Sequence, residues 1–599
     1  MRTLYKIAAS LMTVYLLLLT LGAVDFLDAN NPYHLPLFVV LFYFYEPYAW
    51  PVATLLYLLA TWIISASKLK DMLTYLSTQR FRDGMIVITG YCILVGYLLL
   101  SPYYSLWFPV FLAPCCLVFP YVFTHQAIRN PTEARTDTLW LLGKGGQRLP
   151  LNAPELGVFI VGSPGSGKTK FVIEPLMYRL ISQGYTGILY DYDFSSDAMG
   201  RNYSLSHLAY HCCKHFTGGN THFVSINFQD LIKTSRINPL SPRYIKDRNS
   251  LSQTLRTLLL NMAPGIKEDF WYKNTYALLK GLSILFANRY PSQCTLPHLI
   301  VAGLQPAEEL MSLLQQDPEA RLYASPILDA YERAPEQLAG VLANFKVMLD
   351  KLLDPAMFWV LSGDDAPAVV NDPEAPTVIC LGNTPTKKES FAPILAMLVS
   401  FLSTNMYGHG RAKSFVMLDE LPTLFLPNLS EVPATARKYG VSTIVALQNM
   451  AQLEKRYTAV GASELQETFS NHLIGKSAYK VAKEWSERVG KREVKTTSHT
   501  SAKNQDSKTV HEKEKLILTP QETMDLGVGE FLGSVAASDQ PFFRMNLSPI
   551  GAYHSKLKYE HFKPLPITTR RIDARANFQA IRYQVREITQ AKKCLTNLF

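Results

Sequence analysis

The feature that most constrains this chain is a glycine-rich loop placed directly after a short apolar strand. Residues 157–161 form a β-rich run that predicts a buried strand, and the next residues match the pattern GxxxxGK[ST]. The loop consists of Gly162, Ser163, Pro164, Gly165, Ser166, Gly167, Lys168 and Thr169. Glycines let such a loop wrap so that its N–H groups point at phosphate oxygens, and the following helix adds its dipole. We therefore expect a phosphate site in which Lys168 reaches the β- and γ-phosphates and Thr169 holds Mg²⁺.

A second strand supplies the acidic groups that a triphosphate site needs. Residues 415–418 are four apolar residues, and Asp419 and Glu420 follow them. We expect Asp419 to bind the Mg²⁺ shell and Glu420 to orient and deprotonate the attacking water. The two motifs together predict nucleotide hydrolysis with ATP and Mg²⁺ as ligands.

A third β-rich run, residues 441–447, ends at Gln448. A polar residue at that point is placed to sense the γ-phosphate or to position water. Arg437 precedes this strand, and two interpretations of it stay open. It is either a solvated helix residue or an arginine finger that reaches a neighbouring subunit's nucleotide, where it would supply the positive charge that phosphoryl transfer requires.

The hydrophobic residues are concentrated before residue 125 and predict a membrane anchor. Segments 5–24, 52–64, 85–101 and 106–124 are the candidate spans. We expect about four membrane helices, with two or three as alternatives. The Lys and Arg residues around them all fall on one side, and the intervening connections at 25–34 and 102–105 carry none. By the positive-inside rule, both termini are cytoplasmic.

Composition bounds the remaining classes. Charged residues make up 18 % and hydrophobic residues 48 % of the chain, which excludes a disordered protein or a polar repeat array. The net charge of +10 suits an anionic partner such as nucleic acid or a lipid surface. The eight cysteines form no CxxC pair, so a disulfide scaffold is not expected. After residue 125, helix and strand patterns alternate, which predicts an α/β body.

The chain between the two nucleotide motifs is far longer than a few βαβ units of about 30 residues require. Its surplus shows helix-like apolar spacing at 251–260, 271–288, 307–316 and 336–353, which predicts an all-α insertion. From residue 264 to 365 there are 8 Lys plus Arg against 13 Asp plus Glu. This charge favours a protein contact over nucleic-acid binding, although an ordinary solvated surface fits equally well.

Two later segments differ in character. Residues 551–599 carry ten Lys or Arg against three acidic residues, with Tyr553, Tyr559, Phe562, Phe578 and Tyr583 interleaved. This mixture suits single strands, phosphate backbones or an anionic protein, and a plain solvated tail is the alternative. Residues 496–515 are polar and mixed in charge, and we expect them to form a mobile loop.

Several further motifs, spread over much of residues 155–548, resemble the VirD4/TraG family of type IV secretion coupling proteins. The strongest block comprises 418–424, 437–441 and 447–453. Additional matches are the Pro-containing segment 170–176, Asn238-Pro239-Leu240, the Trp-bearing 269–271 and the Leu-Thr-Pro-type segment 517–522.

The resemblance implies a RecA-like motor with an all-α cap, assembled as a membrane-anchored hexamer whose channel passes DNA. It also implies a relaxase-bound DNA substrate, relaxosome partners and a secretion channel at the bacterial inner membrane. The residue roles that it carries over are hydrolysis at Lys168, Thr169, Asp419 and Glu420, the finger at Arg437 and the motif glutamine at Gln448.

This chain departs from the family at two points. Asp191-Tyr192-Asp193-Phe194 stands where the family usually has Asp-Pro-Lys-Gly, and four spans exceed the usual two. Two other functions stay open: a double-strand translocase of the FtsK type, and a nucleotide-gated receptor that docks protein effectors only. The predicted domains are a membrane anchor at 1–130, a nucleotide-binding domain in two parts at 131–247 and 366–550, the all-α insertion at 248–365 and a basic extension at 551–599.

Overall fold

The computed structural model describes residues 139–195, 203–245, 247–262, 269–502, 505–538 and 541–596. None of the helices in these ranges is both long and apolar enough to cross a bilayer. The predicted membrane spans all precede residue 139 and lie outside the described residues. The anchor and its orientation therefore stay predictions.

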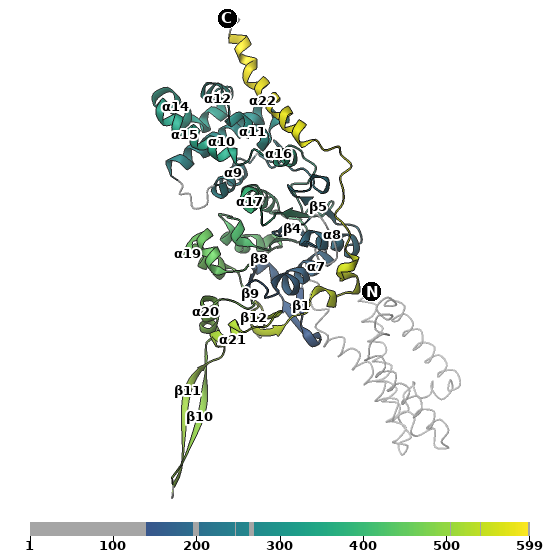
Figure 1. The fold of residues 1–599 in the computed structure, drawn as a ribbon, viewed down its shortest axis with the longest axis vertical. Helices are drawn as coiled ribbons and strands as arrows, with labels where there is room; N and C mark the ends of the chain where they lie inside the picture. The colour runs from purple at the N-terminus through teal and green to yellow at the C-terminus, as the bar shows by residue number, and fades with distance from the viewer. Residues whose placement is uncertain are drawn as a thin grey trace, which may run out of the picture. The chain divides into compact units, whose positions relative to one another are not determined.

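A nine-stranded sheet organises the α/β body (Figure 1). Its order is β13-β12-β9-β3-β8-β7-β4-β6-β5. The strands are β3 (Val158–Val161), β4 (Thr186–Asp191), β5 (His222–Ile226), β6 (Thr377–Gly382), β7 (Ser414–Leu418), β8 (Val441–Leu447), β9 (Asn471–Ile474), β12 (Glu530–Ser534) and β13 (Phe542–Asn546). Those from β9 to β5 pair in parallel, while β12 pairs antiparallel with both β9 and β13. The strands predicted around 157–161, 415–418 and 441–447 are confirmed.

Both faces of this sheet are covered, which explains why its strands read as continuous apolar runs. Val158 and Ile160 point into a core shared with α7 (Glu174–Ser182) and α8 (Leu205–Phe216). Phe159 and Val161 point into the opposite core, shared with α17 (Lys388–Thr404). The alternation follows from the two-residue period of a strand. The predicted α/β fold is confirmed.

In its described residues, the insertion between β5 and β6 consists of helices and connecting loops and contains no strand. It contains α9 (Arg248–Met262), α10 (Phe270–Arg289), α11 (Leu296–Gly303), α12 (Ala307–Leu314), α13 (Pro318–Tyr323), α14 (Ser325–Arg333), α15 (Pro335–Asp350) and α16 (Pro355–Leu361). Asp269, Asp317 and Asp354 cap the starts of α10, α13 and α16 by accepting hydrogen bonds from backbone N–H groups. The predicted all-α insertion is confirmed, and the exact domain boundaries stay predictions.

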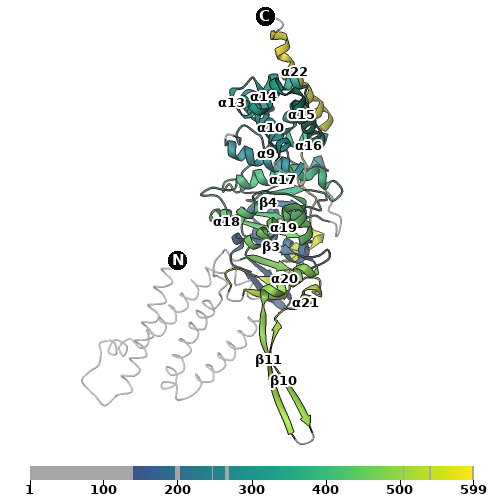
Figure 2. The same ribbon diagram turned by 90° about the vertical axis from the view of Figure 1, so that its left-hand side faces the viewer.

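The prediction of a mobile loop at 496–515 is wrong. β10 (Lys491–Ala502) and β11 (Gln505–Leu516) pair as a long antiparallel ribbon, which leaves the sheet beside α20 (Tyr479–Val489) and α21 (Pro520–Met524) (Figure 2). Polarity suggested a loop, but Thr and Val recur through both halves, and β-branched residues favour extended backbone. A two-stranded ribbon needs no buried face to complete its backbone ladder, so hydrophobic alternation could not reveal it.

The C-terminal extension is packed against the body rather than solvated. It passes from the sheet side to the insertion and ends in α22 (Ala574–Thr596), which contacts α11 and α16 (Figure 1). Leu557, Leu565, Ile581 and Val585 are buried along its course. The plain solvated tail is therefore excluded.

Candidate nucleotide site

The predicted site residues follow three of four neighbouring parallel strands. In the sheet, β9, β3, β8 and β7 are adjacent, so their carboxyl ends meet at one edge. The glycine-rich loop follows β3, Asp419 and Glu420 follow β7, and Gln448 follows β8. Ligands of open parallel sheets bind at this edge. The fold thus brings the loop, both carboxylates and Gln448 together.

The loop has the conformation that its glycines were expected to allow. Gly165 and Gly167 have φ of 80° and 91°, in the left-handed region that L side chains rarely adopt. A Cβ at Gly162 would collide with Ser166 Oγ, because the loop closes tightly through a 3.0 Å bond from Ser166 N–H to the Ser163 carbonyl. Helical residues begin at Thr169, the last residue of the loop, and continue into α7.

Lys168, Glu420 and Gln448 form one connected group. Lys168 Nζ lies 3.4 Å from Glu420 Oε2, and the Gln448 N–H donates to Glu420 Oε1 at 3.3 Å. Burial raises the pKa of Glu420, and Lys168 opposes that shift. A buried carboxylate held by a lysine and a backbone amide has a fixed orientation, as a general base requires.

Asp419 fits a magnesium ligand. Its side chain is buried and its Oδ1 makes no hydrogen bond. Burial raises the pKa of Asp419 to about 7, while Lys168 lowers it. A buried carboxylate oxygen without a partner is costly unless something completes its coordination. Mg²⁺ is usually held by one or two protein oxygens together with phosphates, and Asp419 with the Thr169 hydroxyl supplies such a set.

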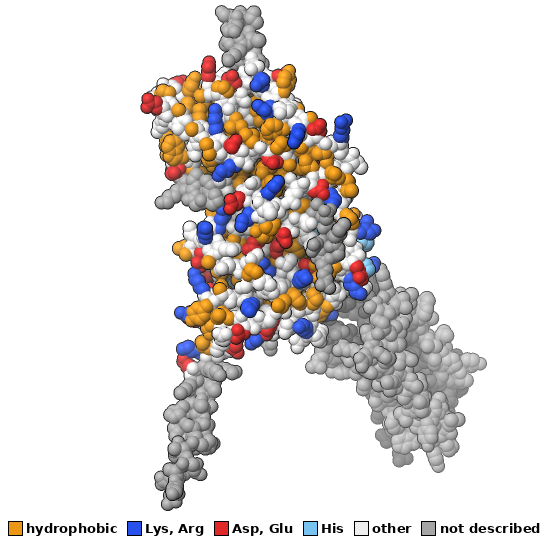
Figure 3. Space-filling model, in the orientation of Figure 1, with side chains coloured by type: hydrophobic (Ala, Val, Ile, Leu, Met, Phe, Trp, Pro, Cys, Tyr) orange, Lys and Arg blue, Asp and Glu red, His pale blue; other side chains and the backbone are white. Residues whose placement is uncertain are grey.

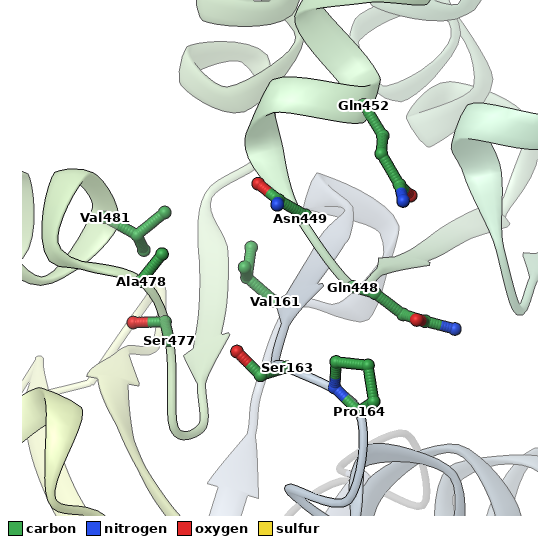
Figure 4. Close-up of a pocket in the computed structure, with 9 residues that line it drawn as sticks. All are labelled: Val161, Ser163, Pro164, Gln448, Asn449, Gln452, Ser477, Ala478 and Val481. Atoms are coloured by element: carbon green, nitrogen blue, oxygen red, sulfur yellow. The ribbon is translucent and has the colours of Figure 1, made fainter.

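A cavity of about 150 Å³ adjoins the first residues of the loop (Figure 4). Its walls include Ser163, Pro164 and Gln448, and also Asn449, Gln452 and Ser477, which sequence reasoning missed. Ser477 is buried and its Oγ makes no hydrogen bond. This cavity places further polar groups beside the loop.

The β9 end is also fastened to the loop. The Ser163 N–H donates to the Lys476 carbonyl at 2.8 Å, so Lys476 and Ser477 lie beside the start of the glycine-rich loop. The sequence itself marks this segment. Residues 471–474 are followed by Gly475-Lys476-Ser477, which is similar to the Gly-Lys-Thr at the end of the loop. Its adjacency to β3 could be known only from the folded sheet.

Arg437 is not brought to this chain's own phosphate loop. It is exposed and precedes β8, whereas Gln448 follows β8 at the other edge of the sheet. A seven-residue strand separates the two edges by roughly 20 Å. Arg437 cannot serve this chain's nucleotide, and its role toward a neighbouring subunit stays a prediction.

The departure after β4 has a structural explanation. Asp191 Oδ2 accepts hydrogen bonds from Ser206 N–H at 2.9 Å and Ser206 Oγ at 2.7 Å, so it anchors the first turn of α8. Burial raises the pKa of Asp191, and these bonds oppose the shift. Phe194 packs directly over Gly382, where a Cβ would collide with its ring. The segment 191–194 therefore holds elements together.

Comparisons with known proteins agree with this fold. Residues 414–527 match the family described as the TraM recognition site of TraD and TraG. No curated protein matches the chain significantly. Among solved structures, unbound TrwBdeltaN70, a bacterial conjugative coupling protein, has a TM-score of 0.54 at 16% identity and covers 70% of this chain and 91% of its own.

Nucleotide-bound structures of the same coupling protein are also similar to this chain. The structures of TrwB with ADP and Mg²⁺, and with a non-hydrolysable ATP analogue, each have a TM-score of 0.51 at 16% identity and cover 68% of this chain and 89% of their own. At this identity the likeness establishes the fold. With the family match, it confirms the resemblance to VirD4/TraG-type coupling proteins.

Proposed function

We propose that this chain, which has the fold of VirD4/TraG-type coupling proteins, is an ATPase that delivers relaxase-bound DNA to a type IV secretion channel. The observation that carries the proposal is the shared sheet edge, where the glycine-rich loop, Asp419, Glu420 and Gln448 converge. TrwB binds ADP with Mg²⁺ and an ATP analogue, which supports ATP and Mg²⁺ as ligands here.

Each residue at this edge has a distinct part in hydrolysis. The loop N–H groups and Lys168 would bind the β- and γ-phosphates, and Thr169 and Asp419 would hold Mg²⁺, which would supply positive charge to the phosphate oxygens. Glu420 takes a proton from water, whose oxygen then bonds to the γ-phosphorus as the bond to the ADP oxygen breaks. Gln448 positions that water or senses the γ-phosphate.

The Lys168–Glu420 pair suggests how the base is controlled. Lys168 lies 3.4 Å from Glu420, so a triphosphate competes with Glu420 for the lysine ammonium. A carboxylate that loses a nearby cation becomes a stronger base, because the cation had stabilised its charged form. Nucleotide binding would thus raise the basicity of Glu420 when a substrate is in place.

The remaining parts of the proposal concern location and assembly. The apolar segments before residue 125 support a multi-pass anchor in the bacterial inner membrane, with the ATPase body and both termini in the cytoplasm. A homo-hexamer would let Arg437, which cannot reach its own chain's loop, serve the next subunit. The match to the TraM recognition site of TraD and TraG supports relaxosome proteins as partners.

ATP hydrolysis by the full-length, detergent-solubilised protein tests the proposal. The assay compares no nucleic acid, single strands and duplex, with Lys168→Ala as the control. We expect stimulation by single strands that the Lys168→Ala variant abolishes. Preference for duplex would contradict this and favour an FtsK-type translocase. Absence of both binding and stimulation, with relaxosome proteins added, would favour a receptor for protein effectors.

A further inference from the structure

One face of helix α22 packs against the insertion. Ile581 and Val585 are buried, and the Phe578 ring lies 4.7 Å from the ring of Phe358 on α16. His298 Nε2 is 2.8 Å from Gln584 Oε1. These contacts fix the rotation of α22, and therefore which of its side chains face outward.

The outward side carries a line of arginines. Arg575, Arg582 and Arg586 are exposed and stand seven and four residues apart. At 3.6 residues per turn they fall within about 40° of one another and extend over about 16 Å. Figure 3 shows blue side chains along the edge of the molecule that α22 forms. We call these three residues the arginine stripe.

The stripe is not neutralised by the protein itself. Within the described residues, none of its members forms an ion pair with a carboxylate, whereas Arg570, just before α22, lies 2.9 Å from Asp365. The insertion beneath is acidic, with 8 Lys plus Arg against 13 Asp plus Glu from residue 264 to 365. The Arg582 guanidinium lies 5.9 Å from the centroid of the Phe578 ring, which leaves its charge available. Guanidinium groups in a line without carboxylate partners, on an acidic body, form a localised anion-binding surface.

We propose that the arginine stripe binds the phosphate backbone of a nucleic-acid strand, with Tyr583 as a stacking platform for a base. Tyr583 follows Arg582 and is 63% exposed, although most aromatic residues of the extension are packed internally. Guanidinium forks suit phosphate oxygens, and an exposed aromatic ring beside them suits an unpaired base better than a folded acidic protein. The inference rests on the proposed function, because it assigns the transferred strand a contact on α22, which packs on the insertion.

Strand binding by the full-length, detergent-solubilised protein tests the stripe. One variant combines Arg575→Gln, Arg582→Gln and Arg586→Gln. The matched control combines Lys556→Gln, Lys558→Gln and Lys563→Gln, which removes the same charge from exposed positions of the same extension. The affinity for a labelled oligothymidylate is measured by anisotropy across salt concentrations. Hydrolysis without nucleic acid reports that both variants are folded.

We expect the arginine variant to lower the salt dependence, the slope of log K against log[salt], by about 2, because each single-strand phosphate contact contributes about 0.7. The lysine control should keep most of the wild-type slope. Tyr583→Ala should weaken strand binding about tenfold and leave the slope of log K against log[salt] unchanged.

Equal slopes and affinities in the arginine variant and the control would overturn the inference and leave an acidic protein or an anionic membrane as the partner. If the wild type itself neither binds strands nor is stimulated by them, the proposed function fails as well.

Discussion

The residue types of two regions predicted ligand binding: the sheet edge that carries the glycine-rich loop, and the C-terminal extension. In the fold, the predicted side chains converge at the sheet edge, whereas most aromatic side chains of the extension pack internally. At the edge, the motif residues of three strands converge as expected, and Lys168, Glu420 and Gln448 are joined by direct contacts. In the extension, most of the aromatic residues serve internal packing. Tyr559 stacks on Tyr203 with ring centroids 4.6 Å apart, and Phe578 contacts Phe358.

The difference lies in what each pattern specifies. A glycine-rich loop between a strand and a helix fixes backbone geometry, so spacing alone places its side chains. A basic and aromatic composition fixes no register, so it cannot say which aromatic rings face inward. Of the tyrosine and phenylalanine residues that the structure describes in the extension, only Tyr583 is exposed, and the exposed arginine stripe lies beside it.

The largest effect should come from removing the base. Glu420→Gln should lower kcat by about 10²- to 10⁴-fold, the usual contribution of general-base catalysis, while nucleotide binding is retained. Steady-state hydrolysis and fluorescent-nucleotide binding measure the two quantities. Glu174→Gln, which changes another buried carboxyl group of the motor, is the matched control and should keep near-normal kcat. Similar losses in both variants would argue against a special role for Glu420.

Breaking the packing of α22 should have the next largest effect. Ile581 is 3% exposed, and truncating a buried isoleucine typically costs about 2–5 kcal/mol. Ile581→Ala should therefore release α22 from the insertion, seen as faster hydrogen exchange over 574–590. Tyr583→Ala on the exposed side should leave that exchange unchanged. Slow exchange in both variants would contradict the division of α22 into packed and exposed faces.

The raised pKa of Asp419 predicts a pH dependence. Its folded pKa of about 7 exceeds the ordinary 3.8, so its contribution to folding stability is present below about pH 4 and is lost as pH rises through 7. Mg²⁺ requires the ionised form. Below pH 7, apparent Mg²⁺–nucleotide affinity should therefore fall up to about tenfold per pH unit.

Calorimetric titrations of wild type and Asp419→Asn at each pH check this, because the difference between them cancels the nucleotide's own titration. Glu174, whose pKa burial also raises to about 7, provides the control variant Glu174→Gln, which should keep the wild-type profile. A pH profile in Asp419→Asn that is identical to wild type would contradict the assignment.

The smallest effect should come from the ion pair before α22. Arg570 shares Asp365 with Arg236, and both arginines are partly exposed, so Arg570→Gln should cost no more than about 1 kcal/mol of stability. Thermal unfolding measures it, with Arg571→Gln, an exposed neighbour, as the control. A loss comparable to that of Ile581→Ala would show that charge, rather than apolar packing, holds the extension.

Much of the α/β body and the insertion could be predicted because local signals coincide with the fold. The loop after β3, the carboxylates after β7 and the apolar period of α10 and α15 are each contained in one short segment. Lys476 and Ser477 could not be placed, because β9 lies beside β3 through a pairing of residues more than 300 positions apart. Nor could the β10–β11 ribbon be predicted, because a two-stranded ladder joins backbone groups and requires no hydrophobic pattern in the sequence.

Displacement of streptavidin from a biotinylated single strand tests the central claim, that hydrolysis at this edge moves a strand, most directly. With ATP, the full-length wild type should displace streptavidin, whereas Glu420→Gln should bind nucleotide and strand but leave the streptavidin in place. Strand-stimulated hydrolysis without displacement would contradict the account, as would equal displacement by Glu420→Gln.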